Sequence, residues 1–274
     1  MNFKSCWLAF QNSSAHVPDT LLVIKLDISE DFIGLFQLVL IEKGLYMLNL
    51  TTNEDHQEFL KLNMNYWTFT GILNYIPGLS NWKEMLHCWK YLKGTQDHGL
   101  FLKPDTNEMV KRIQIYTDAK WGEDQETRIS QSGSIALWKS FPILWGSKKQ
   151  RKIILSSTES KLNAFLDGEQ ENQWVTFLIQ ELWKLQLDPT LFHVSNGGLL
   201  ENLKNFGSNS KTKHLDIKIK NLGEMFLKKE IDVKLTSSQN MLANSLSKAA
   251  PHSSVKKLQD RCLRVILSSN MEGC

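Results

Sequence analysis

The sequence predicts an α/β fold in which a five-stranded mixed sheet is flanked by helices. Three extended runs lie between residues 113 and 147, and the first alternates apolar with polar residues, which is the period of a half-buried strand. A long amphipathic segment begins after Ser156 and stops before Pro189, and its apolar residues recur with the period of a helix. Strands and helices then alternate, which gives the order β-β-β-α-β-α-α-β-α.

The first strand ends in a carboxylate. Ile113, Ile115 and Thr117 alternate with polar or partly polar neighbours, and Asp118 follows them. An open α/β sheet presents groups to ligands at the carboxyl ends of its strands. Asp118 is therefore a candidate site residue.

The long helix has a start signal and one apolar face. Ser156 and Glu159 have the spacing of a capping box. The apolar face holds Leu162, Phe165, Leu166, Trp174, Phe177, Leu178, Leu182 and Leu185. Gly168 weakens the helix by about 1 kcal/mol relative to alanine. The later elements are expected as a strand at 191–194, helices at 196–204 and 216–229, a strand at 231–235 and a last helix at 239–248.

The composition is that of a globular chain. Its 42% hydrophobic content excludes extensive disorder, and its net charge of +3 is too small to imply a polyanionic partner without local clustering. The four cysteines lie far apart without zinc spacing, and no signal-peptide pattern opens the chain. We expect an intracellular protein, cytoplasmic or nuclear, with no contact to a membrane. Core packing is expected for five tryptophans: Trp121, Trp138, Trp145, Trp174 and Trp183.

Several motifs resemble the ribonuclease H domain of copia-type retrotransposon Pol polyproteins, and they fall in that family's order and at its spacings. They are Tyr116-Thr117-Asp118-Ala119-Lys120-Trp121, Ser132-Gly133, Trp145-Gly146-Ser147-Lys148-Lys149-Gln150, Ser156-Ser157-Thr158-Glu159, Lys211-Thr212-Lys213-His214-Leu215-Asp216-Ile217 and Leu242-Ala243. Upstream, Tyr91-Leu92-Lys93-Gly94-Thr95 resembles the end of the same polyprotein's reverse transcriptase. The resemblance implies a truncated reverse transcriptase connection at 1–104, a ribonuclease H-like domain at 105–250 and a tail at 251–274.

The same resemblance implies hydrolysis of the RNA strand of an RNA–DNA hybrid by two Mg²⁺ ions. Two hard cations about 4 Å apart need several carboxylate ligands. The family's four acids fall here on Asp118, Lys161, Ser195 and Asn244, so one acid of the four is retained. Because an ammonium group repels a divalent cation, we expect magnesium binding to fail, with Asp118 as a weak metal ligand at most. The chain is predicted to be a catalytically decayed pseudoenzyme.

The predicted residual function is weak, salt-sensitive binding of an RNA–DNA hybrid or another nucleic acid. Six residues are candidates for phosphate contacts: Lys148, Lys149, Arg151, Lys152, Lys213 and His214. The basic run equally suits a solvated hairpin end, and His214 suits an ordinary surface loop.

Two alternatives stay open. One is an active RNA–DNA hybrid endonuclease with a rearranged metal site, for which Glu159, Asp167 and Asp216 are the available acids. The other is a protein-interaction remnant without nucleic-acid affinity.

Overall fold

The computed structural model of the chain describes residues 25–28, 33–36, 90–91, 93–95, 97–105, 111–123, 127–151, 154–205 and 213–265. Its contacts divide the chain into two compact units. The smaller unit comprises residues 2–101 and 263–274, and the larger unit runs from Leu102 to Cys262. The boundaries expected at 104 and 250 stay predictions, and most of the expected reverse transcriptase remnant lies outside the described residues.

The smaller unit is built on a sheet in the order β1-β2-β3-β9. Its strands are β1 (Lys25–Ile28), β2 (Ile33–Phe36), β3 (His98–Leu102) and β9 (Leu263–Val265). β1 pairs with β2 and β3 pairs with β9, both antiparallel. The C-terminal strand therefore belongs with segments from the N-terminal half of the sequence.

The larger unit contains the predicted five-stranded mixed sheet. Its strands are β4 (Ile113–Lys120), β5 (Gln131–Trp138), β6 (Phe141–Lys149), β7 (Thr190–Val194) and β8 (Ile231–Leu235). The order is β6-β5-β4-β7-β8, with antiparallel pairing from β6 to β4 and parallel pairing from β4 to β8. The α/β fold class with a mixed sheet flanked by helices is confirmed.

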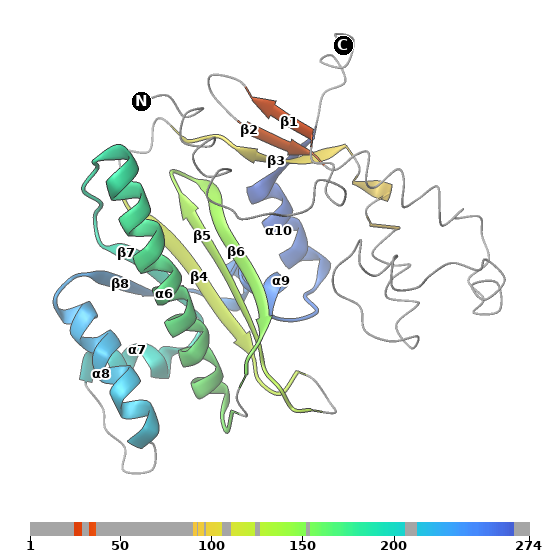
Figure 1. Cartoon of the computed structure of the whole chain (residues 1–274). Coiled ribbons are helices and arrows are strands. Elements are labelled where there is room, and N and C mark those ends of the chain that lie inside the picture. Colours follow the sequence, from red (N-terminus) through yellow and green to blue (C-terminus); the bar gives the residue numbers. More distant parts are fainter. Residues whose placement is uncertain are drawn as a thin grey trace, which may run out of the picture. The chain divides into compact units, whose positions relative to one another are not determined.

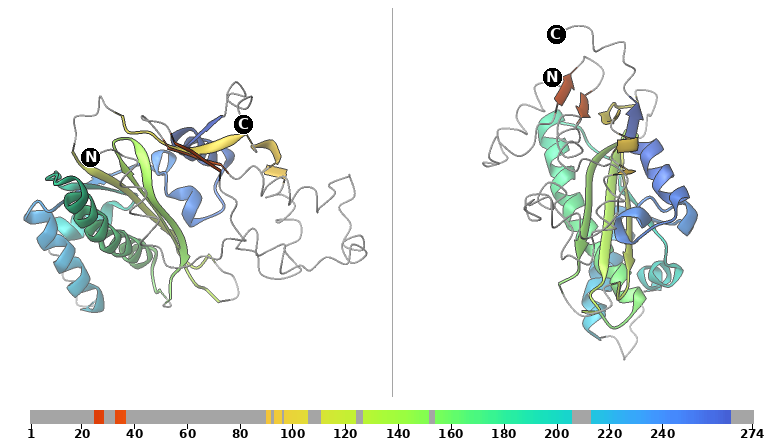
Figure 2. Two further views of the ribbon diagram at one scale, coloured as in Figure 1. Left: turned by 45° about the horizontal axis from the view of Figure 1, so that its top comes forward. Right: turned by 90° about the vertical axis from the view of Figure 1, so that its right-hand side faces the viewer.

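Helices cover both faces of this sheet (Figures 1 and 2). They are α6 (Ser157–Trp183), α7 (Gly197–Asn205), α8 (Lys213–Leu227), the 3-10 turn η2 (Ser238–Asn240), α9 (Asn244–Ser247) and α10 (His252–Cys262). The long helix α6 lies on one face, and α9 and α10 lie on the other. Phe165 of α6 and Phe192 of β7 are fully buried between helix and sheet, with ring centroids 4.7 Å apart.

Two glycines allow the helices to approach the sheet closely. A Cβ atom on Gly168 of α6 would lie 2.8 Å from the Cγ2 atom of Thr117 in β4. A Cβ atom on Gly133 of β5 would lie 2.7 Å from the backbone of α9 at Leu246 and Ser247. Since Gly133 is paired with Asp118, this second close approach seats α9 beside the carboxylate at the end of β4.

The long helix begins where the sequence predicts. Ser156 is its N-cap, and the Ser156 hydroxyl accepts a hydrogen bond of 3.1 Å from the backbone N–H of Glu159. The Glu159 carboxylate accepts from the N–H of Leu155, one residue before the N-cap. The second half of the predicted capping box is therefore shifted by one residue.

Three expectations about local structure are wrong. The helix expected at 239–248 is divided into η2 and the single turn of α9. The helix expected from Asp216 begins at Lys213. Three of the five tryptophans are about half exposed, namely Trp121, Trp145 and Trp174.

Within the described residues, we find no helix with the length and apolarity needed to cross a membrane.

Candidate functional site

Asp118 lies at the carboxyl end of β4, and its side chain is fully buried. The Ser195 hydroxyl donates to Asp118 Oδ1 at 2.9 Å, and the Ser247 hydroxyl donates to Asp118 Oδ2 at 3.1 Å. The Lys161 Nζ atom lies 3.3 Å from Oδ1, and the Lys248 Nζ atom lies 3.2 Å from Oδ2. Each carboxylate oxygen thus faces one hydroxyl and one ammonium group.

Four separate elements bring these groups together. Lys161 lies in the first turns of α6, and its Nζ atom also donates to Ser195 Oγ at 2.6 Å. Ser195 directly follows β7, which pairs parallel with β4, so both strands end at the same edge of the sheet. Ser247 and Lys248 lie at the end of α9 on the opposite face. We call Asp118, Lys161, Ser195, Ser247 and Lys248 the Asp118 cluster.

The electrostatics of the cluster favour an ionised aspartate. Burial raises the pKa of Asp118, but Lys161, Lys248 and the hydrogen bond from Ser195 oppose this effect, and together they lower the pKa below its usual value. The two lysine side chains are about one quarter exposed. One carboxylate and two ammonium groups leave the cluster with a formal charge of +1.

These residues do not fit a two-metal site. Mg²⁺ requires about six oxygen ligands at roughly 2.0–2.1 Å, and the cluster offers one carboxylate whose two oxygens already face ammonium groups. A divalent ion about 4 Å from one ammonium group would be repelled by about 8 kcal/mol at an effective dielectric constant of 20. In the part of the chain that the structure describes, no group of three or more His, Cys, Asp or Glu side chains is arranged to hold a metal ion.

The structure brings two of the three replaced positions to Asp118. Lys161 and Ser195 contact its carboxylate directly. Asn244 lies on α9 and is buried, but its side-chain amide donates to the backbone carbonyl of Ser238. The assignment of these positions as former metal ligands stays a prediction.

Sequence reasoning missed Ser247 and Lys248 as contacts of Asp118. Lys248 ends the Ala243–Lys248 run that carries part of the resemblance, so the family pattern already held a signal for it. Their place at the carboxylate depends on the close approach of α9 to Gly133, which no local pattern encodes.

The acids proposed for a rearranged site are engaged elsewhere. Glu159 accepts from the N–H of Leu155 at 3.0 Å. Asp167 lies 3.4 Å from Lys148 on the outer side of α6. Asp216 belongs to α8, but its side chain is outside the described part. The described contacts thus give no second acid within coordinating range of Asp118.

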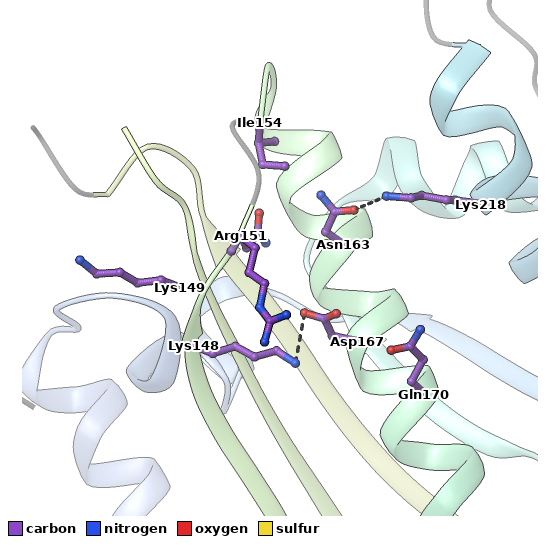
Figure 3. Close-up of a pocket in the computed structure, with 9 residues that line it drawn as sticks. Lys148, Lys149, Arg151, Ile154, Asn163, Asp167, Gln170 and Lys218 are labelled. Atoms are coloured by element: carbon purple, nitrogen blue, oxygen red, sulfur yellow. Dashed lines mark hydrogen bonds and ion pairs between the residues drawn. The ribbon is translucent and has the colours of Figure 1, made fainter. Parts of the chain in front are cut away.

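The predicted phosphate contacts divide into two groups. Lys148 and Lys149 are the last residues of β6, and Arg151 follows them at the edge of a pocket (Figure 3). Lys152 lies outside the described residues, and Lys213 and His214 open α8 with side chains that are not described. The structure therefore places Lys148, Lys149 and Arg151 together, and the other three stay predictions.

The sequence is similar to transposon polyproteins. It is 29% identical over 174 residues to the retrovirus-related Pol polyprotein from transposon RE2 of Arabidopsis thaliana, a match that covers 64% of this chain and 12% of that protein. The Pol polyprotein from transposon TNT 1-94 of Nicotiana tabacum is 27% identical over 175 residues, which are 64% of this chain and 13% of the polyprotein. The chain thus matches about one eighth of the length of these relatives.

Other proteins match smaller or more distant parts. The secreted RxLR effector protein 161 of Plasmopara viticola is 37% identical over 101 residues, which are 36% of this chain and 68% of that protein. Among solved structures, LC11-RNase H1 isolated from compost is 12% identical with a TM-score of 0.40, over 54% of this chain and 99% of that one. The same enzyme in complex with an RNA/DNA hybrid is 12% identical with a TM-score of 0.39, over 49% and 93%.

No protein-family model matches the chain. The polyprotein matches each cover almost two thirds of it, and they agree with the motifs quoted from the sequence. On these matches, the homologues of this chain are retrovirus-related Pol polyproteins of the copia type, and the match covers a segment of each.

Proposed function

We propose that this chain is a ribonuclease H-like segment of a retrotransposon polyprotein whose hydrolytic site has decayed and which retains weak nucleic-acid binding. Its ancestral reaction is the metal-dependent hydrolysis of RNA in RNA–DNA hybrids, with Mg²⁺ as the ancestral cofactor. Homology to Pol polyproteins supports the ancestral role.

One contact carries the proposal of decay. Lys161 occupies a sequence position at which the family resemblance expects an acid, and its Nζ atom lies 3.3 Å from Asp118 Oδ1. Lys248 matches a lysine of the family pattern, so Lys161 is the departure that matters. It replaces a negative ligand by a positive charge on the helix that should help to hold the metal ions.

We expect no Mg²⁺-dependent cleavage of a labelled RNA–DNA hybrid by the full chain, because the cluster cannot hold two divalent ions. The assay is gel analysis at increasing Mg²⁺ or Mn²⁺, with an active ribonuclease H as the positive control. A variant that combines Lys161→Glu, Ser195→Asp and Asn244→Asp should gain a Mn²⁺-dependent rise in melting temperature that the parent lacks. Mg²⁺-dependent cleavage by the parent that Asp118→Asn abolishes would establish the rearranged active site instead.

We expect the full chain to retain a hybrid on filters at about 50 mM salt and to release it at about 200 mM, because its phosphate contacts displace counterions. Replacing both Lys148 and Lys149 by Gln should make the salt dependence shallower, by about 0.9 in the log–log slope for each phosphate that is no longer neutralised. The matched control is Lys256→Gln together with Lys228→Gln, which removes two exposed lysines of α10 and of the end of α8. Absence of retention at low salt would favour the protein-interaction remnant.

A further inference from the structure

A pocket of about 410 Å³ opens between the end of β6, the outer side of α6 and helix α8 (Figure 3). Lys148 and Arg151 line it from the β6 side, and Lys218 reaches it from α8. Asn163 and Asp167 of α6 lie between them. Two consecutive elements, β6 and α6, and the more distant helix α8 thus build one polar pocket.

This pocket is separate from the Asp118 cluster. Asn163, Asp167 and Gln170 are spaced i, i+4 and i+7, so they form one stripe along α6. Lys161 precedes Asn163 by two residues, which turns it by about 200° around the helix axis. The two sites therefore use opposite sides of the same helix.

The lining has a surplus of positive charge. It includes the cations Lys148, Lys149, Arg151 and Lys218 and the carboxylate of Asp167, and a second carboxylate, Glu171, lies 3.9 Å from Lys148. The Lys148–Asp167 pair, at 3.4 Å, is exposed on both sides and contributes at most about 1 kcal/mol. Lys218 donates to the neutral Oδ1 atom of Asn163 at 2.8 Å, so its charge is not compensated by that bond.

The wall that carries the cations is fixed by buried hydrogen bonds. The N–H of Gln150 donates to the Ser130 carbonyl at 2.8 Å, and its Nε2 atom donates to Ser132 Oγ at 2.7 Å and to the Ser160 carbonyl at 2.9 Å. These bonds tie the segment between Lys148 and Arg151 to β5 and α6 before any ligand arrives. Preorganisation of this kind lowers the entropic cost of binding.

We propose that this pocket binds a phosphate group carrying at least two negative charges. Such a group occurs at the end of a nucleic-acid strand and in free pyrophosphate. The volume is in the range of pockets for small ligands, so it admits a terminal nucleotide and not a duplex. Charge-assisted bonds from Lys148, Arg151 and Lys218 are the recognition chemistry. In its strand-end form, the inference rests on the proposed nucleic-acid affinity.

The test measures binding of three probes to the full chain by calorimetry or fluorescence anisotropy at low salt. The probes are inorganic pyrophosphate, a short 5′-phosphorylated DNA oligonucleotide and the same oligonucleotide with a 5′ hydroxyl. Lys218→Gln should weaken the phosphorylated probes about threefold, and Lys148→Gln with Arg151→Gln about tenfold. Asp167→Asn should strengthen them about threefold, because it removes the carboxylate that lines the pocket and repels an anion there.

Lys228→Gln is the matched control, since it neutralises an exposed lysine at the end of α8 beside Glu224, outside the pocket. If the variants change the affinity for both pyrophosphate and the 5′-phosphorylated oligonucleotide, the pocket is assigned to strand ends. If they change the affinity for pyrophosphate alone, it is assigned to free phosphates. Two results would overturn the inference. One is equal binding of the two oligonucleotides together with a pyrophosphate affinity that no variant changes, and the other is weaker binding of the phosphate probes by Asp167→Asn. If hybrid retention fails while pyrophosphate responds, the proposed nucleic-acid affinity fails and the pocket stands. If the hybrid is retained while no variant changes the affinity for pyrophosphate or for the 5′-phosphorylated oligonucleotide, the proposed nucleic-acid affinity stands and the pocket fails.

Discussion

Replacing Asp118 by alanine should lower the free energy of unfolding by about 3 kcal/mol. The substitution leaves the ammonium groups of Lys161 and Lys248 facing each other across the site without a counter-ion, and both side chains are about three quarters buried. Removing one partner of a buried ion pair typically costs about 3–5 kcal/mol, and the partial exposure of the lysines favours the lower end. The hydroxyls of Ser195 and Ser247 lose the Asp118 acceptor as well, although Ser247 can still donate to the Asn244 carbonyl at 3.3 Å.

The measurement is a urea titration of the full chain, with amide hydrogen exchange over residues 113–120 as the probe of this unit. Lys161→Met alone should cost only about 1 kcal/mol, because Lys248 still neutralises the carboxylate. Asp118→Leu combined with Lys161→Met and Lys248→Met should return close to the parent, since a buried ion cluster can be exchanged for apolar packing at little net cost.

Asp232→Ala is the control, since Asp232 lies at 3.1 Å from Arg112 in a partly exposed ion pair on the same sheet. An exposed pair of this kind contributes less than about 1 kcal/mol. If Asp118→Ala is no more destabilising than Asp232→Ala, the cluster does not stabilise the packing of α6 and α9 on the two faces of the sheet.

The pH dependence of this cluster has a fixed sign. The folded-state pKa of Asp118 is lowered, so the folded state binds its proton less tightly than the unfolded state does. The contribution of the cluster is therefore fully present above the unfolded pKa of about 3.9 and is lost as the pH falls through the folded pKa. Asp118→Ala should accordingly differ most from the parent near neutral pH.

Local patterns were sufficient to predict the sheet and the start of the long helix. The alternation of Ile113, Ile115 and Thr117 follows from β4 having one face against α6, and Ser156 caps α6 as its residue type suggests. These features depend on neighbours within one element, which a sequence displays directly.

Features set by contacts between elements could not be predicted in this way. Trp121 resembles a core residue, yet its ring is half exposed and its Nε1 atom donates to the carbonyl of Ile154 at 2.8 Å. The contact of Lys248 with Asp118 joins residues 130 positions apart. Glu169 lies in the polar run 167–172, and its residue type gives no sign of its burial, although it is almost fully buried together with Gly168 and Asn172.

The contribution of Glu169 to the free energy of unfolding should decrease as the pH rises from about 4.5 to about 7. Burial raises its pKa to about 7, with Glu230 adding to the effect, while Asn172 and Gln173 donate hydrogen bonds to its carboxylate at 3.1 and 3.3 Å and oppose it. A carboxyl with a raised folded-state pKa binds its proton more tightly in the folded state. The stability that protonated Glu169 contributes is fully present below the unfolded pKa and is lost as the pH rises through this window. The loss amounts to about 3 kcal/mol.

The buried His193 has the opposite slope, and this decides how Glu169 must be tested. Burial and then Lys234 lower the pKa of His193 to about 4, so the folded state resists protonation and loses stability as the pH falls from about 6.5 to about 4. Between about pH 4.5 and 6.5 the two slopes cancel in part, so the pH profile of the parent alone is not diagnostic. The difference between Glu169→Gln and the parent removes the His193 contribution, and we expect this difference to shift by about 3 kcal/mol in favour of the variant from pH 5 to pH 8. Glu171→Gln, which removes a partly exposed carboxylate from the same helix, should leave the profile as in the parent. A difference between Glu169→Gln and the parent that stays constant over this range would mean that Glu169 is not held protonated by its burial, because only a proton bound more tightly in the folded state produces the slope.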